Sequence, residues 1–285
     1  MNELLAAVGA APADPNTHRT LGDAYAQRRQ WVHASAEYRS ALTLGGDATT
    51  LRPLLNLCQS ALAAGRPADA NSHNLYFRTQ WLARHLLGLF PSGRFSILDA
   101  GGGDGRLSLL LPDADYVLAE PATNGIFVTS ELTFGRTFDC VVCCHVLEHI
   151  PEEGRDAFLD VLCDIADEHV LLLNPVVDPR IDLREWQQKI FEITGAKWAK
   201  EHIDCIMPRL EDITGYAERR GYPCQVKPNG SKVLSLAIVF LDYFAKAGRP
   251  EDVARINQMF NAIALDDLDH AEWPNAFLVD ISTKE

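Results

Sequence analysis

The sequence has few basic residues. Its 285 residues include 26 Lys and Arg against 39 Asp and Glu, which gives a formal charge of −13. A protein that binds nucleic acid needs a basic face to neutralise phosphates, so this balance argues against nucleic acid as a partner. The composition, 47% hydrophobic and 23% charged, is otherwise that of an ordinary globular protein with enough apolar side chains for a sizeable core.

Long hydrophobic runs and a basic leader are also missing. The longest strongly apolar stretch, residues 233–241, is far shorter than the ~20 residues that cross a bilayer. The N-terminus carries Glu3 and Asp14 without an early basic residue, a pattern typical of a helix of the mature protein and not of a signal peptide. We therefore expect no membrane span and a cytoplasmic protein.

Cysteines are few, odd in number and scattered. Three of the seven, Cys140, Cys143 and Cys144, lie in the β-branched and apolar segment 138–144. A zinc site built from cysteines needs paired thiolates on turns and matching His or Cys elsewhere, which this segment does not offer. We expect reduced thiols in the core and no metal site.

Residues 1–70 have a helical pattern. Within residues 15–48, small and large side chains recur at the spacing of two closely packed helices, namely Leu21, Gly22, Tyr25, Ala34, Tyr38 and Ala41. The spacing resembles a tetratricopeptide repeat, with a weaker unit 36 residues later. The resemblance implies a short array that could bind a protein partner. An all-helical cap packed on the larger domain is an equally good interpretation, because solenoids normally stack three or more units.

Strand and helix patterns alternate in the rest of the chain. Residues 71–93 are expected to form a connecting helix, and an α/β domain is expected over residues 94–285. Strand-like runs lie at 96–100, 114–120, 138–144, 169–174, 224–227 and 277–281. The alternation predicts a mostly parallel sheet covered by helices on both faces. Helical insertions are expected at about 178–206 and 230–272.

A glycine-rich segment follows the first expected strand, which ends in Asp99. Its glycines are Gly101, Gly102, Gly103 and Gly105. Glycines let a backbone turn sharply and approach a ligand without a Cβ in the way. The next strand ends in Glu120, 21 residues after Asp99, where a carboxylate can accept hydrogen bonds from both hydroxyls of a ribose. A nucleoside-containing ligand is expected.

The spacing of these glycines separates two classes of nucleoside cofactor. A dinucleotide site would have glycine where Arg106 stands. The pattern Asp-x-Gly-x-Gly-x-Gly instead resembles class I S-adenosylmethionine-dependent methyltransferases. Three further segments resemble ubiquinone-type and related small-molecule members of that family in the same order, namely 138–151, 169–175 and 210–222. The resemblance covers about residues 94–285 and implies a Rossmann-like fold and S-adenosylmethionine as the cofactor.

The resemblance also implies roles for individual positions. Asp99 and the glycines would hold the methionine part, and Glu120 would hold the ribose. Cys144 and His145 would line the cofactor pocket near the sulfonium, with backbone carbonyls in contact more than side chains. A second interpretation has Asp99 brace the loop by accepting from glycine N–H groups without touching the cofactor.

Residues 121–137 depart from the family pattern, because they are too few for a full helix and a third strand. The segment 121–125 favours a turn, which leaves 126–129 as a possible third strand. Ser130 and Glu131 are the candidates for approaching the adenine amino group.

Methyl transfer needs alignment and dehydration of the reactants, and for a hydroxyl acceptor a base that takes the proton. His145, His149 and His202 are the histidines considered for this role, and His149 and His202 are the catalytic candidates. Each one taken singly is better explained as a loop brace that is hydrogen-bonded to nearby backbone. Apolar residues of the two insertions, such as Trp186 and Trp198, would form a lid over the acceptor, or alternatively a second core layer or a dimer surface.

The expected function is methyl transfer to a small-molecule, lipid or glycan acceptor, most favourably at oxygen. One alternative is a protein methyltransferase whose repeats recruit the substrate. The segment after the fourth expected strand lacks the Asn/Asp-Pro-Pro-Tyr/Phe signature of nitrogen acceptors and has Cys143-Cys-His-Val instead. The other alternative is a non-catalytic scaffold with a relic methyltransferase fold, which the complete glycine loop and Glu120 disfavour.

Overall fold

The computed structural model describes residues 1–65, 72–177, 183–245, 248–263, 265 and 273–284. The chain divides into two compact units, each of which is described by itself. Unit 1 comprises Met1–Pro67, Thr79–Val142 and Val161–His169. Unit 2 comprises Ala68–Arg78, Cys143–Asp160 and Val170–Glu285.

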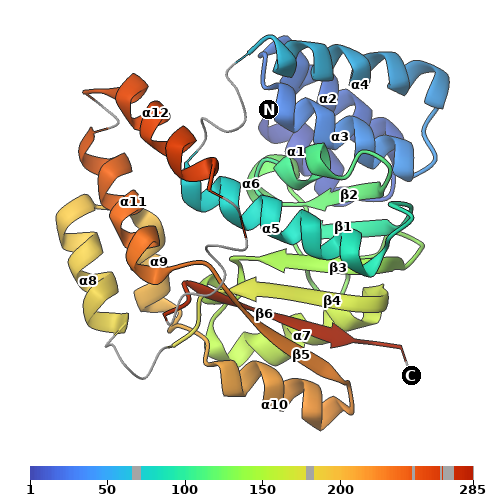
Figure 1. Ribbon diagram of the computed structural model, residues 1–285. Helices are drawn as coiled ribbons and strands as arrows, with labels where there is room; N and C mark the ends of the chain where they lie inside the picture. Colours follow the sequence, from blue (N-terminus) through green and yellow to red (C-terminus); the bar gives the residue numbers. More distant parts are fainter. Residues whose placement is uncertain (66–71, 178–182, 246–247, 264, 266–272, 285) are drawn as a thin grey trace. The chain divides into compact units, whose positions relative to one another are not determined.

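The strands of the described residues form a six-stranded sheet with the order β2-β1-β3-β4-β6-β5 (Figure 1). Their bounds are β1 Ser96–Ala100, β2 Asp115–Ala119, β3 Phe138–Cys144, β4 Ala166–Asn174, β5 Cys224–Asn229 and β6 Ala276–Ser282. β1 pairs in parallel with both β2 and β3, and β5 pairs antiparallel with β6. The mixed sheet with its helices is a Rossmann-like α/β fold, and strands form at all six runs listed above.

Strand β1 has a central place in unit 1. All five of its residues are buried, as expected of a strand with neighbours on both sides. The chain leaves β1 and returns as β2 on one side and as β3 on the other, with Asp99 in register with Leu118 and Val142. In open α/β sheets, ligands bind beyond the carboxyl ends of strands at such a change of direction. The topology therefore points to the segment after β1.

Four helices begin the chain, namely α1 Asn2–Ala10, α2 Pro15–Gln27, α3 Trp31–Thr43 and α4 Ala48–Ala63. Asp14 caps α2 by accepting from the Asn16 N–H at 2.9 Å. The expected helical hairpin over residues 15–48 is confirmed as α2 and α3. A Cβ on Gly22 would lie 2.7 Å from the Tyr38 ring, so glycine is required where the two helices approach.

Helix α3 packs against β2 and against the 3₁₀ helix η2, Arg106–Leu110, in the same unit. The Arg39 guanidinium donates to the backbone carbonyls of Ser108, Leu111 and Ala114. The β2 N–H of Leu118 donates to the Ser40 hydroxyl at 3.1 Å. The inner face of the hairpin is thus occupied by unit 1 itself, in keeping with the interpretation as a cap.

The segment after β2 contains one short helix, α6 Pro121–Asn124, and the expectation of a strand at 126–129 is wrong. Asn124 explains this outcome. Its Oδ1 accepts from the Glu120 N–H at 3.0 Å and from the Ile126 N–H at 3.3 Å, and Gly125 has φ +75°. The side chain therefore takes backbone donors that a strand would use, and holds the chain in a turn.

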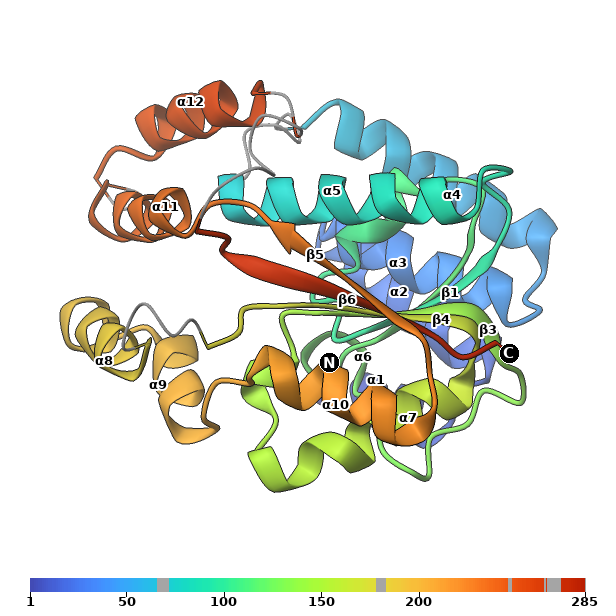
Figure 2. The same cartoon turned by 60° about the horizontal axis from the view of Figure 1, so that its bottom comes forward.

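The remaining helices include α5 His73–Leu89 and α7 Arg155–Ile165, each of which begins in unit 2 and continues in unit 1. Unit 2 also contains α8 Leu183–Thr194, α9 Lys197–Asp204, α10 Leu210–Arg220, α11 Lys232–Ala245 and α12 Pro250–Asn261. Helices α8 and α9 pack on each other, as do α11 and α12 (Figure 2). Among the helices that the structure describes, none has the length and apolarity to cross a bilayer.

Candidate functional site

The glycine loop, residues 101–105, follows β1 in unit 1. Gly101, Gly103 and Gly105 have φ of +78°, +60° and +75°, a region that side chains rarely adopt. Gly102 is required for another reason, since a Cβ there would lie 2.3 Å from Asp99 Oδ2. The backbone of this loop can therefore take its path only with glycine at these positions.

Gly103 is the exposed point of the loop. A Cβ on it would meet no atom within 4 Å, so the space beside it is open. Its N–H donates to Glu120 Oε2 at 3.1 Å, and its carbonyl accepts from the Thr123 hydroxyl at 2.7 Å. These contacts join the loop after β1 to the end of β2 and leave a free face on which a ligand can lie.

Glu120 follows β2 and is half-buried. One carboxylate oxygen accepts from Gly103, and the other caps α6 by accepting from the Ala122 N–H at 3.0 Å. An ionised carboxylate offers about four lone-pair positions, so roughly two remain after these bonds. The loop and the carboxylate are brought together as the sequence analysis requires for a ribose site.

Asp99 lies beneath the glycine loop and is 2% exposed. Burial raises the pKa of its carboxyl group to about 7, while a hydrogen bond from the Tyr116 hydroxyl at 2.6 Å opposes the shift. In the described chain that bond comes from Tyr116 and not from the glycine N–H groups. The ionised form of this buried carboxyl group is unfavourable for folding. A carboxyl group kept in such a place indicates a role in function and not in stability.

Cys144 and His145 belong to unit 2, where Cys144 ends β3. His145 has φ +59°, and such left-handed backbone costs a residue with a side chain about 1 kcal/mol or more. Its N–H donates to the Leu173 carbonyl at 2.8 Å, which holds the strained residue in place. Strain of this kind gathers at functional sites, so the position merits a role beyond packing.

The segment after β3 is anchored from two sides. The buried Asn174 side chain at the end of β4 accepts from the N–H groups of Val146 and Leu147 at 2.9 and 3.1 Å. The Arg155 guanidinium donates to carbonyls on both the β3 segment and the end of α9, namely those of Leu147, Ile150, Cys205 and Ile206. α9 is therefore fixed against the short 3₁₀ helix η3, Leu147–His149.

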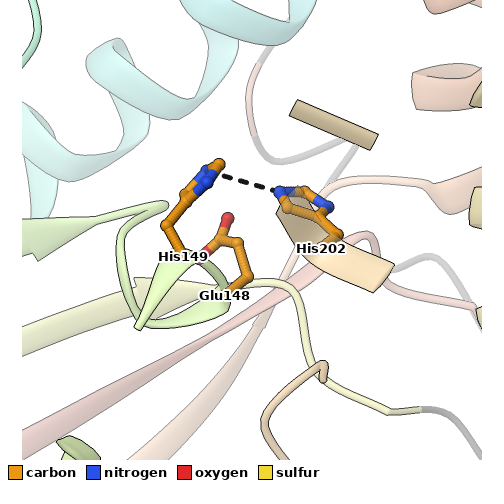
Figure 3. A group of neighbouring side chains, drawn as sticks. All are labelled: Glu148, His149 and His202. Carbon is orange, nitrogen blue, oxygen red and sulfur yellow. Dashed lines mark hydrogen bonds between the residues drawn. The ribbon is translucent and has the colours of Figure 1, made fainter. Parts of the chain in front are cut away.

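This anchoring brings three polar side chains together, Glu148, His149 and His202 (Figure 3). The Nε2 atoms of the two histidines are 3.4 Å apart. The Glu148 carboxylate is 0% exposed and points toward the gap between the rings. The two catalytic candidates of the sequence analysis, 53 residues apart in the chain, thus lie side by side.

Their environments differ. Burial lowers the pKa of His202 to about 4, so this imidazole is neutral at physiological pH. His149 is about one-third exposed, and its Nδ1 lies 2.8 Å from Glu201 Oε2. Burial also lowers the pKa of His145, whose Nδ1 is 3.2 Å from Glu148 Oε1. The pKa of Glu148 is lowered although burial opposes this, because the contact with His145 favours the carboxylate.

A cavity of about 650 Å³ opens beside these side chains within unit 2. His145, Glu148, His149 and His202 line one part of it, and Arg78 of α5 adds a positive charge. Both helical insertions contribute to its walls, through residues such as Ile190, Trp198 and Leu234. The volume is that of a small-molecule site.

Sequence reasoning selected the histidines but missed Glu148, Glu201 and Arg155. A local signal existed for the first of these, because residues 145–149 read His-x-x-Glu-His, a spacing that some metalloenzymes use. Glu201 and Arg155 carry no such signal, since their partners are distant in the chain.

No protein-family model and no curated protein matches the sequence. Solved structures are similar at low identity. The plantazolicin methyltransferase BpumL, in complex with a pentazolic desmethylPZN analog and SAH, is 11% identical with a TM-score of 0.45, over 90% of this chain and 98% of that chain. Magnesium protoporphyrin IX methyltransferase ChlM of Synechocystis PCC 6803, with bound SAH, is 13% identical with a TM-score of 0.42, over 71% and 82%. A SAM dependent methyltransferase from Archaeoglobus fulgidus is 14% identical with a TM-score of 0.41, over 72% and 94%.

Proposed function

We propose that this protein is an S-adenosylmethionine-dependent methyltransferase that methylates a small-molecule acceptor, most favourably at an oxygen atom. The observation that carries the proposal is the glycine loop. Three of its glycines have positive φ, its exposed face at Gly103 is open, and the Glu120 carboxylate lies 3.1 Å from the Gly103 nitrogen. This arrangement suits a ribose held by the carboxylate and a chain of ligand atoms lying along the glycines.

The residues of unit 1 fit such a cofactor in charge as well as in shape. Asp99, Asp104 and Glu120 gather around the loop, and Asp104 is already paired with Arg106 at 2.6 Å. S-adenosylmethionine supplies an electrophilic methyl group on a positively charged sulfur and also carries an ammonium group. A positive ligand near Asp99 would favour its ionised form. Asp99 would thus either accept from the ammonium or support the loop from below.

We assign the acceptor to the cavity of unit 2. Its walls combine apolar side chains with Arg78 and the histidines, so a partly apolar molecule with one or two oxygen groups would be matched. A volume of about 650 Å³ is in the range of small-molecule sites. That Cys144 and His145 line the cofactor pocket near the sulfonium stays a prediction of the resemblance.

His149 is the better of the two histidines as a proton acceptor. Its Nδ1 lies 2.8 Å from the Glu201 carboxylate, which orients the ring and leaves Nε2 toward Glu148 and His202. His202, with a pKa of about 4, accepts a proton poorly at neutral pH. We therefore propose His149 as the base, with His202 in a positioning role.

The helical hairpin gives no support to the recruitment of a protein substrate. Helix α3 uses its inner face for β2 and η2, and Arg39 and Ser40 bond to that part of unit 1. The scaffold alternative predicts no cofactor binding, and the experiment below separates it from methyl transfer.

The test is calorimetric titration with S-adenosylhomocysteine. We expect micromolar affinity for the wild-type chain and a loss of at least tenfold in Glu120→Lys, where an ammonium replaces the acceptor of the ribose hydroxyls. Asp115→Asn is the matched control, because it removes an exposed carboxylate from the other end of the same strand. Absence of binding by the folded wild-type chain, or equal affinity in Glu120→Lys, would overturn the proposal.

A further inference from the structure

The cluster of Glu148, His149 and His202 has the composition of a metal site. One donor atom from each side chain can be chosen such that all three lie within 4.8 Å of one another. Two imidazoles and one carboxylate form a donor set that proteins use for zinc and for other divalent transition metals. The three side chains converge on one point from two segments, the loop after β3 and the end of α9 (Figure 3).

The distance between the imidazoles fits an ion better than it fits a direct bond. Two nitrogens bound at about 2.0–2.1 Å to a tetrahedral zinc ion lie roughly 3.3 Å apart. The Nε2 atoms of His149 and His202 are 3.4 Å apart. Hydrogen bonds from N–H to oxygen usually measure about 2.7–3.2 Å, and 3.4 Å is long by that standard. The spacing of these two nitrogens therefore suits a shared ion.

Polar atoms at the cluster are buried without partners. Neither carboxylate oxygen of Glu148 has a hydrogen-bond partner, although its side chain is 0% exposed. His145 Nδ1 lies 3.2 Å from Oε1 but outside hydrogen-bond geometry. His202 Nδ1 is likewise buried and unpartnered. Buried polar atoms are normally partnered, and a cation bound by Glu148 and His202 would give the carboxylate a partner.

Neighbouring residues hold the three clustered side chains in position. Glu201 Oε2 lies 2.8 Å from His149 Nδ1, which fixes the tautomer that presents the Nε2 lone pair to the cluster. Arg155 bonds both segments that carry the ligands, and Asn174 holds the turn at Val146 and Leu147. Carboxylate–histidine pairs of this kind accompany most histidine ligands of metals.

We propose that Glu148, His149 and His202 bind one divalent transition-metal ion of the zinc class, with its remaining coordination positions open to the cavity. Three protein ligands and an open position are the arrangement of catalytic and not of structural sites. The ligand that the open positions would take is an acceptor carrying a hydroxyl or carboxylate oxygen. Metal binding stands independently of methyl transfer, whereas the role given next rests on the proposed function.

In that role the ion orients the acceptor hydroxyl and lowers its pKa. With the ion bound, the His149 imidazole is a ligand and takes no proton, so the hydroxyl proton leaves to solvent. The acceptor oxygen then forms a bond to the methyl carbon, the carbon–sulfur bond breaks, and its electron pair stays on sulfur. Atoms and charges balance without an additional reactant.

The metal is tested directly with the full-length chain. The protein is stripped with a chelator, dialysed, and titrated with Co²⁺ and with Zn²⁺, followed by absorption spectroscopy and calorimetry. We expect one ion per chain, with the visible bands of Co²⁺ in a nitrogen and oxygen site. The free cysteines are a competing source of ligands, and a thiolate-to-cobalt charge-transfer band would assign the ion to them and overturn the proposal.

The variants separate a site from incidental binding. His202→Ala and His149→Ala are expected to lose at least 100-fold in affinity for Co²⁺. Glu201→Gln, which changes an exposed residue outside the ligand set, is expected to lose about tenfold or more, within the range found for such partners. Asp204→Asn is the control, because it removes an exposed carboxylate from the end of the same helix and should leave the affinity unchanged. Circular dichroism confirms folding of each variant.

The outcomes distinguish this inference from the proposed function. Binding of S-adenosylhomocysteine without binding of Co²⁺ or Zn²⁺ would overturn the metal site and leave the methyltransferase proposal standing. Binding of Co²⁺ or Zn²⁺ by a chain that does not bind S-adenosylhomocysteine would overturn the methyltransferase proposal and leave the metal site standing. Equal Co²⁺ affinity in wild type, His149→Ala and His202→Ala would also overturn the site.

Discussion

The Tyr116 hydroxyl donates a hydrogen bond to Asp99 at 2.6 Å, and both side chains are almost completely buried under the glycine loop. The carboxyl group of Asp99 has a pKa of about 7, mainly because burial disfavours its charge. The loop is therefore built over a group that is only partly ionised at neutral pH. This relationship makes the stability of the protein depend on pH in a direction that can be measured.

Asp99→Asn should stabilise the protein more at pH 8 than at pH 5. The folded pKa lies above the unfolded value near 3.8, so the buried acid contributes stability that is complete below about pH 4 and is lost as the pH rises through 7. The amide does not titrate, and the advantage of the variant should reach on the order of 2–4 kcal/mol at pH 8. Urea denaturation at the two values measures it.

Tyr116→Phe provides the complementary experiment for this pair. The hydrogen bond from Tyr116 favours the ionised acid, so its loss should raise the pKa of Asp99 further and move the pH-dependent window upward. A difference between Asp99→Asn and wild type that stays constant from pH 5 to 8 would contradict the buried-acid interpretation.

Gly105→Ala should disturb the seat of helix α3 on the glycine loop. A Cβ at this position would lie 2.3 Å from the Ala36 Cβ, and the backbone has φ +75°. We expect a loss of about 2–4 kcal/mol in the free energy of unfolding, from the clash together with the strained backbone. Thermal or urea denaturation measures the loss.

A second substitution separates the two causes. Ala36→Gly removes the opposing methyl group, so Gly105→Ala with Ala36→Gly should lose less than the sum of the single variants by about 1 kcal/mol or more. Additive losses would show that the two side-chain positions do not meet. Gly45→Ala, at φ +91° with no atom near, is the control for backbone strain alone.

His18→Ala should strongly destabilise the N-terminal hairpin. His18 Nδ1 is 2.7 Å from Glu37 Oε2, both side chains are fully buried, and Glu37 Oε1 accepts from Asn124 at 3.1 Å. Removing one partner leaves a buried charge uncompensated, at a cost of about 3–5 kcal/mol at pH 6. The exposed pair Arg19 and Asp23, 4.0 Å apart, is the control, and Arg19→Ala should cost under about 1 kcal/mol.

The stability contributed by His18 and Glu37 depends on pH in a defined direction. Burial lowers the pKa of His18, but the hydrogen bond and charge of Glu37 outweigh it, so the folded pKa lies above 6.5. The stabilisation is complete below about pH 6.5 and is lost as the pH rises through the folded value. The penalty of His18→Ala should therefore be smaller at pH 9 than at pH 6, and a larger penalty at pH 9 would refute the charged pair.

Arg155→Lys should detach the end of α9 from the loop after β3. The guanidinium serves carbonyls on both segments, among them Ile150 at 3.1 Å and Cys205 at 2.8 Å, and an ammonium cannot reproduce that planar fork. Amide hydrogen exchange over residues 197–206 should accelerate by tenfold or more. Turnover should fall although Arg155 contacts none of the three clustered side chains. Unchanged exchange in this segment would show that other contacts hold α9.

Much of the fold could be predicted because it depends on local patterns. The six strand runs, the helical hairpin and the glycine loop follow from alternation, spacing and the φ preference of glycine, which are properties of short segments. Local patterns could not show that the third strand proposed at 126–129 does not form. Its outcome depends on the Asn124 side chain, which takes the N–H groups of Glu120 and Ile126.

The sequence by itself determined where the strands lie, that Gly101 to Gly105 turn tightly after β1, and that a carboxylate ends β2. Only the tertiary structure decided that α3 rests on β2 through Ser40 and on the segment before β2 through Arg39, and that His202 meets Glu148 and His149. Backbone preferences act between neighbouring residues, whereas these contacts join residues separated by tens of positions. Such contacts form only when the packing of the whole unit, and anchors such as Arg155, bring the segments together.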